Sequence, residues 1–177
     1  MYAIGDLILY GRTGVCRVEE IGEGAPCGAD GPQKYYMLKP LYQKCSIRTP
    51  VAGGKVFHRP IVSRREAESL IRRMPEMEAE PYYNHNLNQL REHYRKRLEN
   101  CACEDLVVLT KSLYRKKREA EAQRRKLGSV DERYMKEAED LLYGELAAAL
   151  EIERAAVEGY IAGFLGAAEG SAVDNSL

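Results

Sequence analysis

Hydrophobic and polar positions follow two different periods along the chain, and the change falls near residue 62. Before it, short runs rich in β-branched and aromatic residues alternate with polar residues between Gly and Pro. The runs are GDLILYGRTGVCRVEEI (5–21), KYYMLKPLY (34–42), KCSIRTPV (44–51) and GKVFHRPI (54–61). They predict four or five short strands, in which Pro40 and Pro50 are confined to edges, bulges or strand ends. So many short strands in about 60 residues indicate a small, strongly bent antiparallel sheet or barrel.

From Ser63 onwards the apolar positions recur at helical spacing. SRRE at 63–66 and SVDE at 129–132 have the pattern of capping boxes, in which a hydroxyl and a glutamate satisfy first-turn amides. The first box predicts a short helix that ends near Pro75, and the second predicts the start of the last long helix. Two further helices are expected over 87–100 and 104–126. The last helix carries a core-facing stripe: Tyr134, Ala138, Leu141, Leu142, Leu146 and Leu150.

These patterns predict an α+β protein with two parts. The expected divisions are a β-module over 1–61, an all-α helical domain over 62–168 and a flexible tail over 169–177. The sequence contains no apolar run of about 18 residues and does not begin like a secretory signal peptide. We therefore expect a cytoplasmic protein that has no contact with a membrane.

Catalytic and metal-binding patterns are missing from the sequence. The five cysteines, Cys16, Cys27, Cys45, Cys101 and Cys103, are odd in number and lack the spacing of a disulfide framework, so reduced thiols are expected. Cys101 and Cys103 form only a C-x-C pair, and a structural zinc site would need two more ligands. No nucleophile motif or phosphate-binding glycine loop occurs. We expect neither an enzyme nor a bound cofactor or metal.

Charge is distributed unevenly, although the formal net charge is zero. Residues 91–126 carry 12 Lys and Arg against 6 Asp and Glu, whereas residues 128–177 carry 3 against 11. Two basic segments, REHYRKR (91–97) and YRKKREAEAQRRK (114–126), could each present several cations to phosphates. The alternative is a solvated helix surface of mixed charge, because Glu119 and Glu121 follow the second cluster of cations directly.

Two adjacent tyrosines, Tyr82 and Tyr83, come after Pro81 and shortly before the first basic segment. Such rings could insert at a distorted groove of nucleic acid, where unstacked bases accept a planar wedge. They could equally pack as a hydrophobic latch between helices, and the residues alone favour the latch.

The ordered set of segments resembles the CarD-like (CdnL) family of bacterial regulators that bind RNA polymerase. GDLILYGRTGVCRVEEI, YYMLKPLYQKCSIRTPV and AEDLLYGELAAALEI carry the resemblance and together span most of residues 1–165. It implies that the N-terminal part is a Tudor-like (SH3-like) β-barrel, a module shared with transcription-repair coupling factors.

On the polymerase side, the resemblance implies that this module docks on the polymerase β subunit. Arg48, flanked by Ile47 and Thr49, falls on the polymerase-contact arginine of the family. A second contact arginine of the family meets Gly24 in this sequence. An exposed sheet edge would also suit pairing with a strand of the partner.

On the DNA side, the resemblance implies that the helical part binds promoter DNA at the upstream edge of the bubble and stabilises the open complex. The family wedges a tryptophan into the minor groove, whereas this chain contains no tryptophan. Tyr83 or Tyr82 is the nearest aromatic residue to that position. The expected phosphate contacts are Arg91, Arg95, Lys96 and Arg97. The implied protein is a nucleoid-associated regulator; the alternative is a protein-only polymerase adaptor that does not wedge DNA.

Overall fold

The computed structural model describes residues 1–24 and 33–173, and for residues 168–173 it describes the backbone alone. Within it the chain forms two compact units, Met1–Ile61 and Val62–Leu177. Cys27 and residues 174–177 lie outside the described residues. Residues 169–173 of the expected tail are helical, because the last helix continues to Val173.

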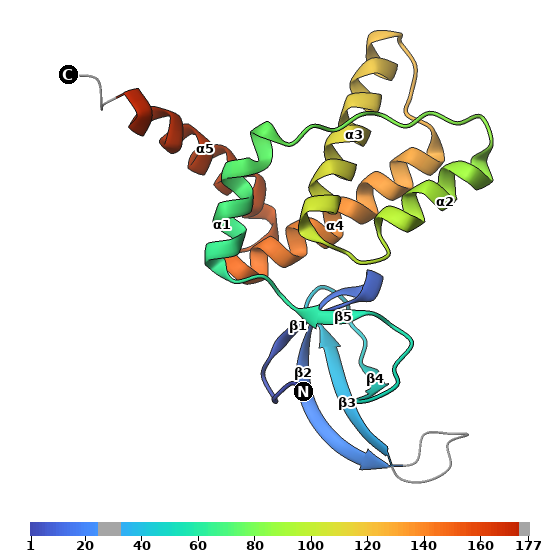
Figure 1. The fold of residues 1–177 in the computed structure, drawn as a ribbon, viewed down its shortest axis with the longest axis vertical. Coiled ribbons are helices and arrows are strands. Elements are labelled where there is room, and N and C mark those ends of the chain that lie inside the picture. Colours follow the sequence, from blue (N-terminus) through green and yellow to red (C-terminus); the bar gives the residue numbers. More distant parts are fainter. Residues whose placement is uncertain (25–32, 174–177) are drawn as a thin grey trace. The chain divides into compact units, whose positions relative to one another are not determined.

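The first unit is a five-stranded antiparallel sheet (Figure 1). Its strands follow the spatial order β4-β3-β2-β1-β5. They are β1 (Leu7–Tyr10), β2 (Gly14–Gly24), β3 (Gln33–Pro40), β4 (Ile47–Pro50) and β5 (His58–Pro60), with a 3₁₀ turn η1 (Gly11–Thr13) between the first two. This confirms the predicted antiparallel sheet.

The sheet is not closed into the barrel that we expected, since β4 and β5 remain its two edges in the described part of the chain. Both edge strands are short and end in proline, which has no amide hydrogen to donate to a ladder. The sheet is nevertheless bent: the Tyr10 hydroxyl on β1 donates to the Thr49 hydroxyl on β4 over 3.1 Å, although these strands are not neighbours.

The bend encloses a small apolar core on one face of the sheet. Its buried members are Ile8, Tyr10, Cys16, Val18, Tyr36 and Leu38. A register shift between Val18 and Glu20 on β2 is a bulge, which increases local twist and helps the sheet to curl.

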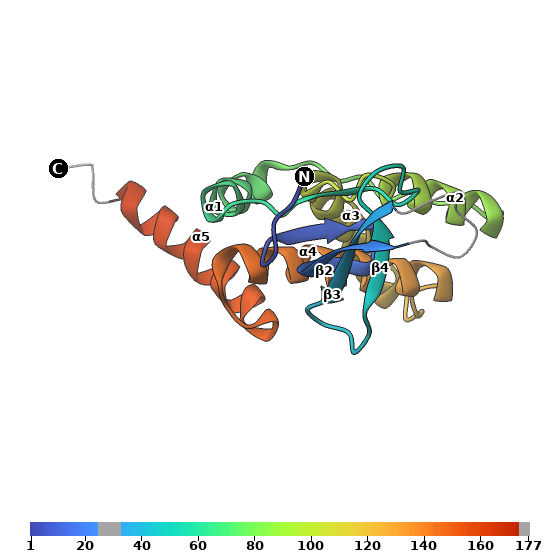
Figure 2. The ribbon, with the colours of Figure 1, turned by 90° about the horizontal axis from the view of Figure 1, so that it is seen from below.

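The second unit is all helical, as the periodicity predicted (Figure 1). Its α-helices are α1 (Arg64–Arg73), α2 (Leu87–Arg97), α3 (Cys103–Ala122), α4 (Ser129–Leu150) and α5 (Val157–Val173), with 3₁₀ turns η2 (Met74–Glu76) and η3 (Arg154–Ala156). Helices α2, α3 and α4 pack against one another, and α1 packs on α4 and α5. Figure 2 shows that α5 begins beside α1 and α4 and that its C-terminal end extends beyond them. No helix in the described ranges is long and apolar enough to cross a membrane.

The core of this unit follows the predicted stripe on α4. All six stripe residues are buried: Tyr134, Ala138, Leu141, Leu142, Leu146 and Leu150. The facing sides of α2 and α3 contribute Leu90, Tyr94, Leu98, Leu106, Leu109 and Leu113. The three helices therefore share one hydrophobic core.

One of the two predicted capping boxes is present. The Ser63 hydroxyl accepts the Glu66 amide, and the Glu66 carboxylate accepts the Ser63 amide over 2.7 Å. The second prediction is wrong: Gly128 is the N-cap of α4, and Ser129 is already inside the helix without a side-chain cap bond. The reason is that the N-cap position falls on Gly128, which has no side chain to accept the first-turn amides.

Substitution of Ser63 and of Ser129 should show which of the two serines caps its helix. Ser63→Ala removes an N-cap and should lower the free energy of unfolding of the helical unit by about 1 kcal/mol. Ser129→Ala is the matched control and should change it by less than about 0.5 kcal/mol. Urea unfolding followed by circular dichroism at 222 nm measures both. Equal losses for the two variants would contradict the assignment of the caps.

Candidate protein and nucleic-acid interfaces

The three predicted polymerase-contact residues lie on the edge strand β4. Arg48 is exposed and Ile47 is half-buried, whereas Thr49 is only 4% exposed and its hydroxyl accepts a hydrogen bond from Tyr10. The strand therefore presents the Arg48 side chain to the surface, while the side chain of Thr49 belongs to the core.

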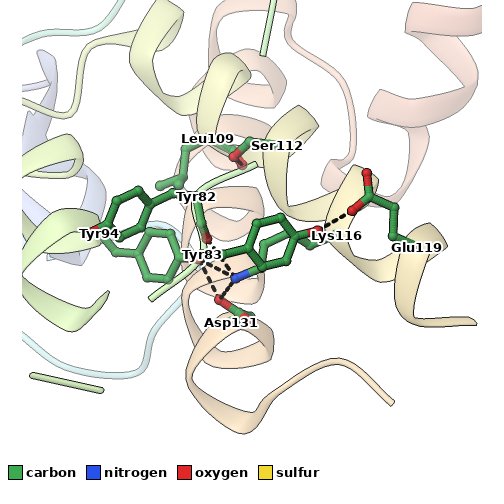
Figure 3. Close-up of polar contacts among 8 residues, drawn as sticks. All are labelled: Tyr82, Tyr83, Tyr94, Leu109, Ser112, Lys116, Glu119 and Asp131. Carbon is green, nitrogen blue, oxygen red and sulfur yellow. Dashed lines mark hydrogen bonds and ion pairs between the residues drawn. The ribbon is translucent and has the colours of Figure 1, made fainter. Parts of the chain in front are cut away.

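The two tyrosines of the linker have different environments (Figure 3). The Tyr82 ring is half-buried and stacks on His93 of α2, with ring centroids 3.9 Å apart and planes 12° from parallel. Tyr83 is 60% exposed, and its hydroxyl donates to the Glu119 carboxylate of α3. Tyr82 is thus the latch, and Tyr83 is an aromatic ring held at the surface.

A buried lysine fixes this arrangement. The Lys116 ammonium on α3 donates to the Asp131 carboxylate of α4 over 2.8 Å, to the Tyr82 carbonyl over 2.9 Å and to the Tyr94 hydroxyl of α2 over 3.3 Å. Figure 3 shows these groups converging. An ammonium has three hydrogens, and here each has an acceptor from a different element. We call Lys116, Asp131, Tyr94 and Tyr82 the lysine hub.

Two tyrosine hydroxyls near the hub, those of Tyr83 and Tyr94, have raised pKa values and stay in their neutral form. The hydrogen bond to Glu119, followed by burial, raises the pKa of Tyr83 to about 12. Burial and a hydrogen bond to Asp131 raise the pKa of Tyr94 further above its usual value. Burial, with the nearby charges of Arg97 and Lys116, lowers the pKa of His93, so the ring under Tyr82 is neutral at pH 7.

Tyr83 also borders a groove of about 670 Å³ between the linker and the α3–α4 loop. Lys116 and Asp131 form part of its lining, and Arg125 and Lys126 stand exposed beside it. The surface around the exposed ring is therefore partly basic.

The basic residues of α2 lie at the surface, as a phosphate-binding role requires. Arg91, Arg95, Lys96 and Arg97 are all exposed. Arg97 pairs with Asp105 over 3.7 Å, and Arg91 donates to the Asn88 side chain over 3.2 Å. Within the described ranges, Arg95 and Lys96 have no acidic partner. These two cations are the most available ones of the predicted set.

Part of the second basic segment, 114–126, is satisfied by the protein itself. Lys116 is buried, and Arg115 pairs with Glu80 over 3.3 Å and with Glu119 over 3.5 Å. Lys111 donates to the carbonyls of Met74 and Met77 in the linker. The row of Lys111, Arg115 and Arg118 lines a groove together with Glu76, Glu78 and Glu80. Arg118, Arg124 and Lys126 are exposed and have no acidic partner in the described ranges, so segment 114–126 also offers cations to phosphates.

The described cysteines are reduced thiols: Cys16, Cys101 and Cys103 are buried and Cys45 is exposed. Burial raises the pKa of the Cys16 thiol to about 12. Cys103 donates to the buried Glu145 carboxylate over 3.2 Å, and this carboxylate also accepts the Val62 amide over 3.0 Å. No group of three or more His, Cys, Asp or Glu side chains in the described part of the chain could hold a metal ion.

Sequence reasoning missed the hub. The run YRKKRE predicts that Lys116 belongs to a basic surface cluster, although it continues the buried stripe of Leu106, Leu109 and Leu113 at helical spacing. That spacing is the signal that could have identified a buried lysine. Its partner, Asp131, lies within SVDE, which has the pattern of a capping box. The sequence therefore did not indicate that the two residues form a buried ion pair.

Comparison with known proteins finds no protein family whose sequence model matches this chain, and no curated protein that matches it.

Breaking the hub should destabilise the helical unit strongly. Lys116→Met leaves the Asp131 carboxylate buried without its cation and should lower the free energy of unfolding by about 3–5 kcal/mol. The double variant Lys116→Met/Asp131→Leu removes both charges and should lose less than the single variant. Lys117→Met, at the half-exposed neighbouring position, is the control and should change stability by less than about 0.5 kcal/mol. Urea unfolding provides the values, and a single variant as stable as the control would refute the role of the pair.

Proposed function

We propose that this chain is a transcription regulator of the CarD-like kind. Its β unit, as a Tudor-like module, binds the RNA polymerase β subunit. Its helical unit binds promoter DNA at the upstream edge of the bubble and thereby stabilises the open complex. Such a protein acts in the bacterial cytoplasm at the nucleoid. The family assignment rests on the resemblance of the three quoted segments, and the observations below support the division of roles.

The observation that carries the DNA role is the exposure of Tyr83 on an anchored backbone. The preceding residue is fixed by the bond from Lys116 to the Tyr82 carbonyl, yet the Tyr83 ring is 60% exposed. Inserting a ring between bases requires an exposed aromatic side chain whose backbone does not move away. Arg95 and Lys96 on α2 then supply contacts to phosphates, which position the protein without selecting sequence.

The mechanism is differential binding. Closed promoter DNA offers no unstacked base step to Tyr83, whereas the upstream edge of the bubble does. Only an interaction made more strongly in the open complex shifts the equilibrium towards it. Contacts between the β unit and polymerase are present in both states, so they concentrate the protein at the promoter without by themselves favouring opening.

A second candidate function is a polymerase adaptor that contacts only proteins. It is favoured by the Glu119 carboxylate, which holds the Tyr83 hydroxyl and would lie close to DNA phosphates if the ring entered a groove. The absence of tryptophan from the sequence points the same way, since tyrosine offers a smaller ring. In this case the helical unit would bind another protein.

The role of Arg95 can be tested by salt dependence. Each phosphate contact contributes a slope of about −0.9 to log K against log salt for duplex DNA. Arg95→Ala should therefore reduce the magnitude of the slope by about one and weaken binding equally on different sequences. Arg115→Ala is the matched control and should keep the slope, because Arg115 already pairs with Glu80 and Glu119. Fluorescence anisotropy with a fork-shaped promoter DNA measures this, and an unchanged slope and affinity would remove Arg95 from the site.

The full proposal is tested by fluorescence-detected promoter opening with purified bacterial RNA polymerase. The wild-type chain should lengthen the lifetime of the open complex. Arg48→Glu should abolish the effect by loss of docking, and Tyr83→Ala by loss of the wedge. Tyr83→Phe keeps the ring and Lys55→Glu reverses another exposed charge of the β unit, so both should behave like wild type. Polymerase binding without any change in opening would favour the adaptor.

A further inference from the structure

Two glycines on β2 make room for an aromatic ring and a guanidinium on the outer face of the sheet. Gly22 is paired with Tyr35 of β3, and a Cβ at Gly22 would lie 2.4 Å from the Tyr35 Cζ atom. A Cβ at Gly24 would lie 2.6 Å from the Arg48 Nη2 atom and 3.6 Å from the Tyr35 ring. Any larger residue at either position would displace the group that lies there.

The side chains above these glycines stack on each other. The Arg48 Cζ atom lies 3.6 Å from the centroid of the Tyr35 ring. This is a close cation–π contact, and the planar ring restricts the guanidinium to an orientation parallel to its face. Tyr35, supported by the Gly22 backbone, therefore fixes the direction in which Arg48 points.

Stacking leaves the hydrogen-bonding edge of the guanidinium available. Arg48 is exposed, and no acceptor for its N–H groups lies within the residues that the structure describes. A planar guanidinium held by its face presents paired donors at its edge, and a carboxylate matches that geometry with two parallel hydrogen bonds. The fitting ligand for this surface is thus an acidic side chain.

The backbone of β4 indicates that the acidic side chain belongs to a protein. The Val51 amide donates to the Lys34 carbonyl of β3. Because backbone groups alternate in direction along an antiparallel strand, those of Arg48 point away from β3, towards the open edge. An extended peptide can both accept from the Arg48 amide and donate to its carbonyl, whereas a phosphate group of nucleic acid can only accept.

We infer that Arg48, Tyr35, Gly22 and Gly24 form a preformed docking surface for an acidic side chain on an extended segment of a protein partner. Tyr35 is the positioning residue for Arg48 in this surface, and Gly24 provides the space that the guanidinium occupies. The inference rests on the proposed function in taking the polymerase β subunit as that partner.

The positioning role is tested first without any partner. Stacking on the ring should shift the Arg48 side-chain proton resonances upfield and restrict the motion of its Nε–H group in nuclear magnetic resonance spectra. Tyr35→Phe should retain both signatures. Tyr35→Leu and Gly24→Ala should abolish them, the second because the added Cβ displaces only the flexible end of Arg48. Arg48 resonances that do not respond to Tyr35→Leu and Gly24→Ala would overturn the positioning role.

Binding to purified RNA polymerase tests the docking role with the same variants. Tyr35→Leu and Gly24→Ala should weaken binding about two- to fivefold, the range of an exposed cation–π contact. Arg48→Ala should weaken binding at least as much, and Arg48→Lys should not restore it, because an ammonium lacks the planar fork. Gly54→Ala is the matched control, since a Cβ there meets its nearest atoms at 3.6 Å and fits. Unchanged melting temperatures would exclude loss of folding.

The two readouts separate the possible failures. If wild type does not bind polymerase, the proposed function and the assigned partner fail together, while the resonance measurements still decide whether Tyr35 and Gly24 position Arg48. If wild type binds and Gly24→Ala binds equally well although its Arg48 signals have changed, the ordered guanidinium is not part of the interface, and the docking surface is refuted.

Discussion

The position of the two linker tyrosines in the candidate DNA site depends on one buried ammonium. Removing a lysine charge from water is costly unless it is paired and fully hydrogen-bonded. Lys116 meets this requirement through Asp131, the Tyr94 hydroxyl and the Tyr82 carbonyl. These acceptors come from α4, α2 and the linker, and Lys116 itself lies on α3. The hydrogen bonds that stabilise its charge therefore also hold three helices and an irregular segment together. A hydrophobic residue at 116 could fill the space, but it could not bind a backbone carbonyl.

The exposure of Tyr83 follows from that constraint. With the carbonyl of Tyr82 directed at Lys116 and its ring stacked on His93, the next side chain is placed on the outside of α3. There its ring lies over the same ammonium, 4.8 Å from the nitrogen, and its hydroxyl meets Glu119. The latch and the surface ring are therefore not alternatives, as the sequence suggested, but two consequences of one anchored dipeptide.

Features determined by local sequence were predictable, and those determined by distant residues were not. The helical stripe on α4 and the Ser63 capping box depend on neighbours within one or two turns, so their patterns identified them. The burial of Lys116 depends on Asp131, which is 15 positions away, and a lysine within YRKKRE otherwise has the pattern of a solvated residue. Likewise Gly24, which stands where the resembling family has a second contact arginine, has its physical explanation in Arg48 of another strand.

The distribution of unpaired charge explains why the two proposed roles depend on each other. The net charge is zero, Glu76, Glu78 and Glu80 line the same groove as the basic row of α3, and the most available cations of the predicted set are Arg95 and Lys96. With so few phosphate contacts in the predicted set, we expect the isolated protein to bind DNA weakly and with a small dependence on salt. A protein that is already bound to polymerase has a high effective concentration beside the promoter. Its helical unit therefore does not have to find the DNA from free solution. In the proposed function, an acidic-side-chain contact at Arg48 would therefore determine where Tyr83 acts, and the helical unit would need only a small preference for open DNA once it is there.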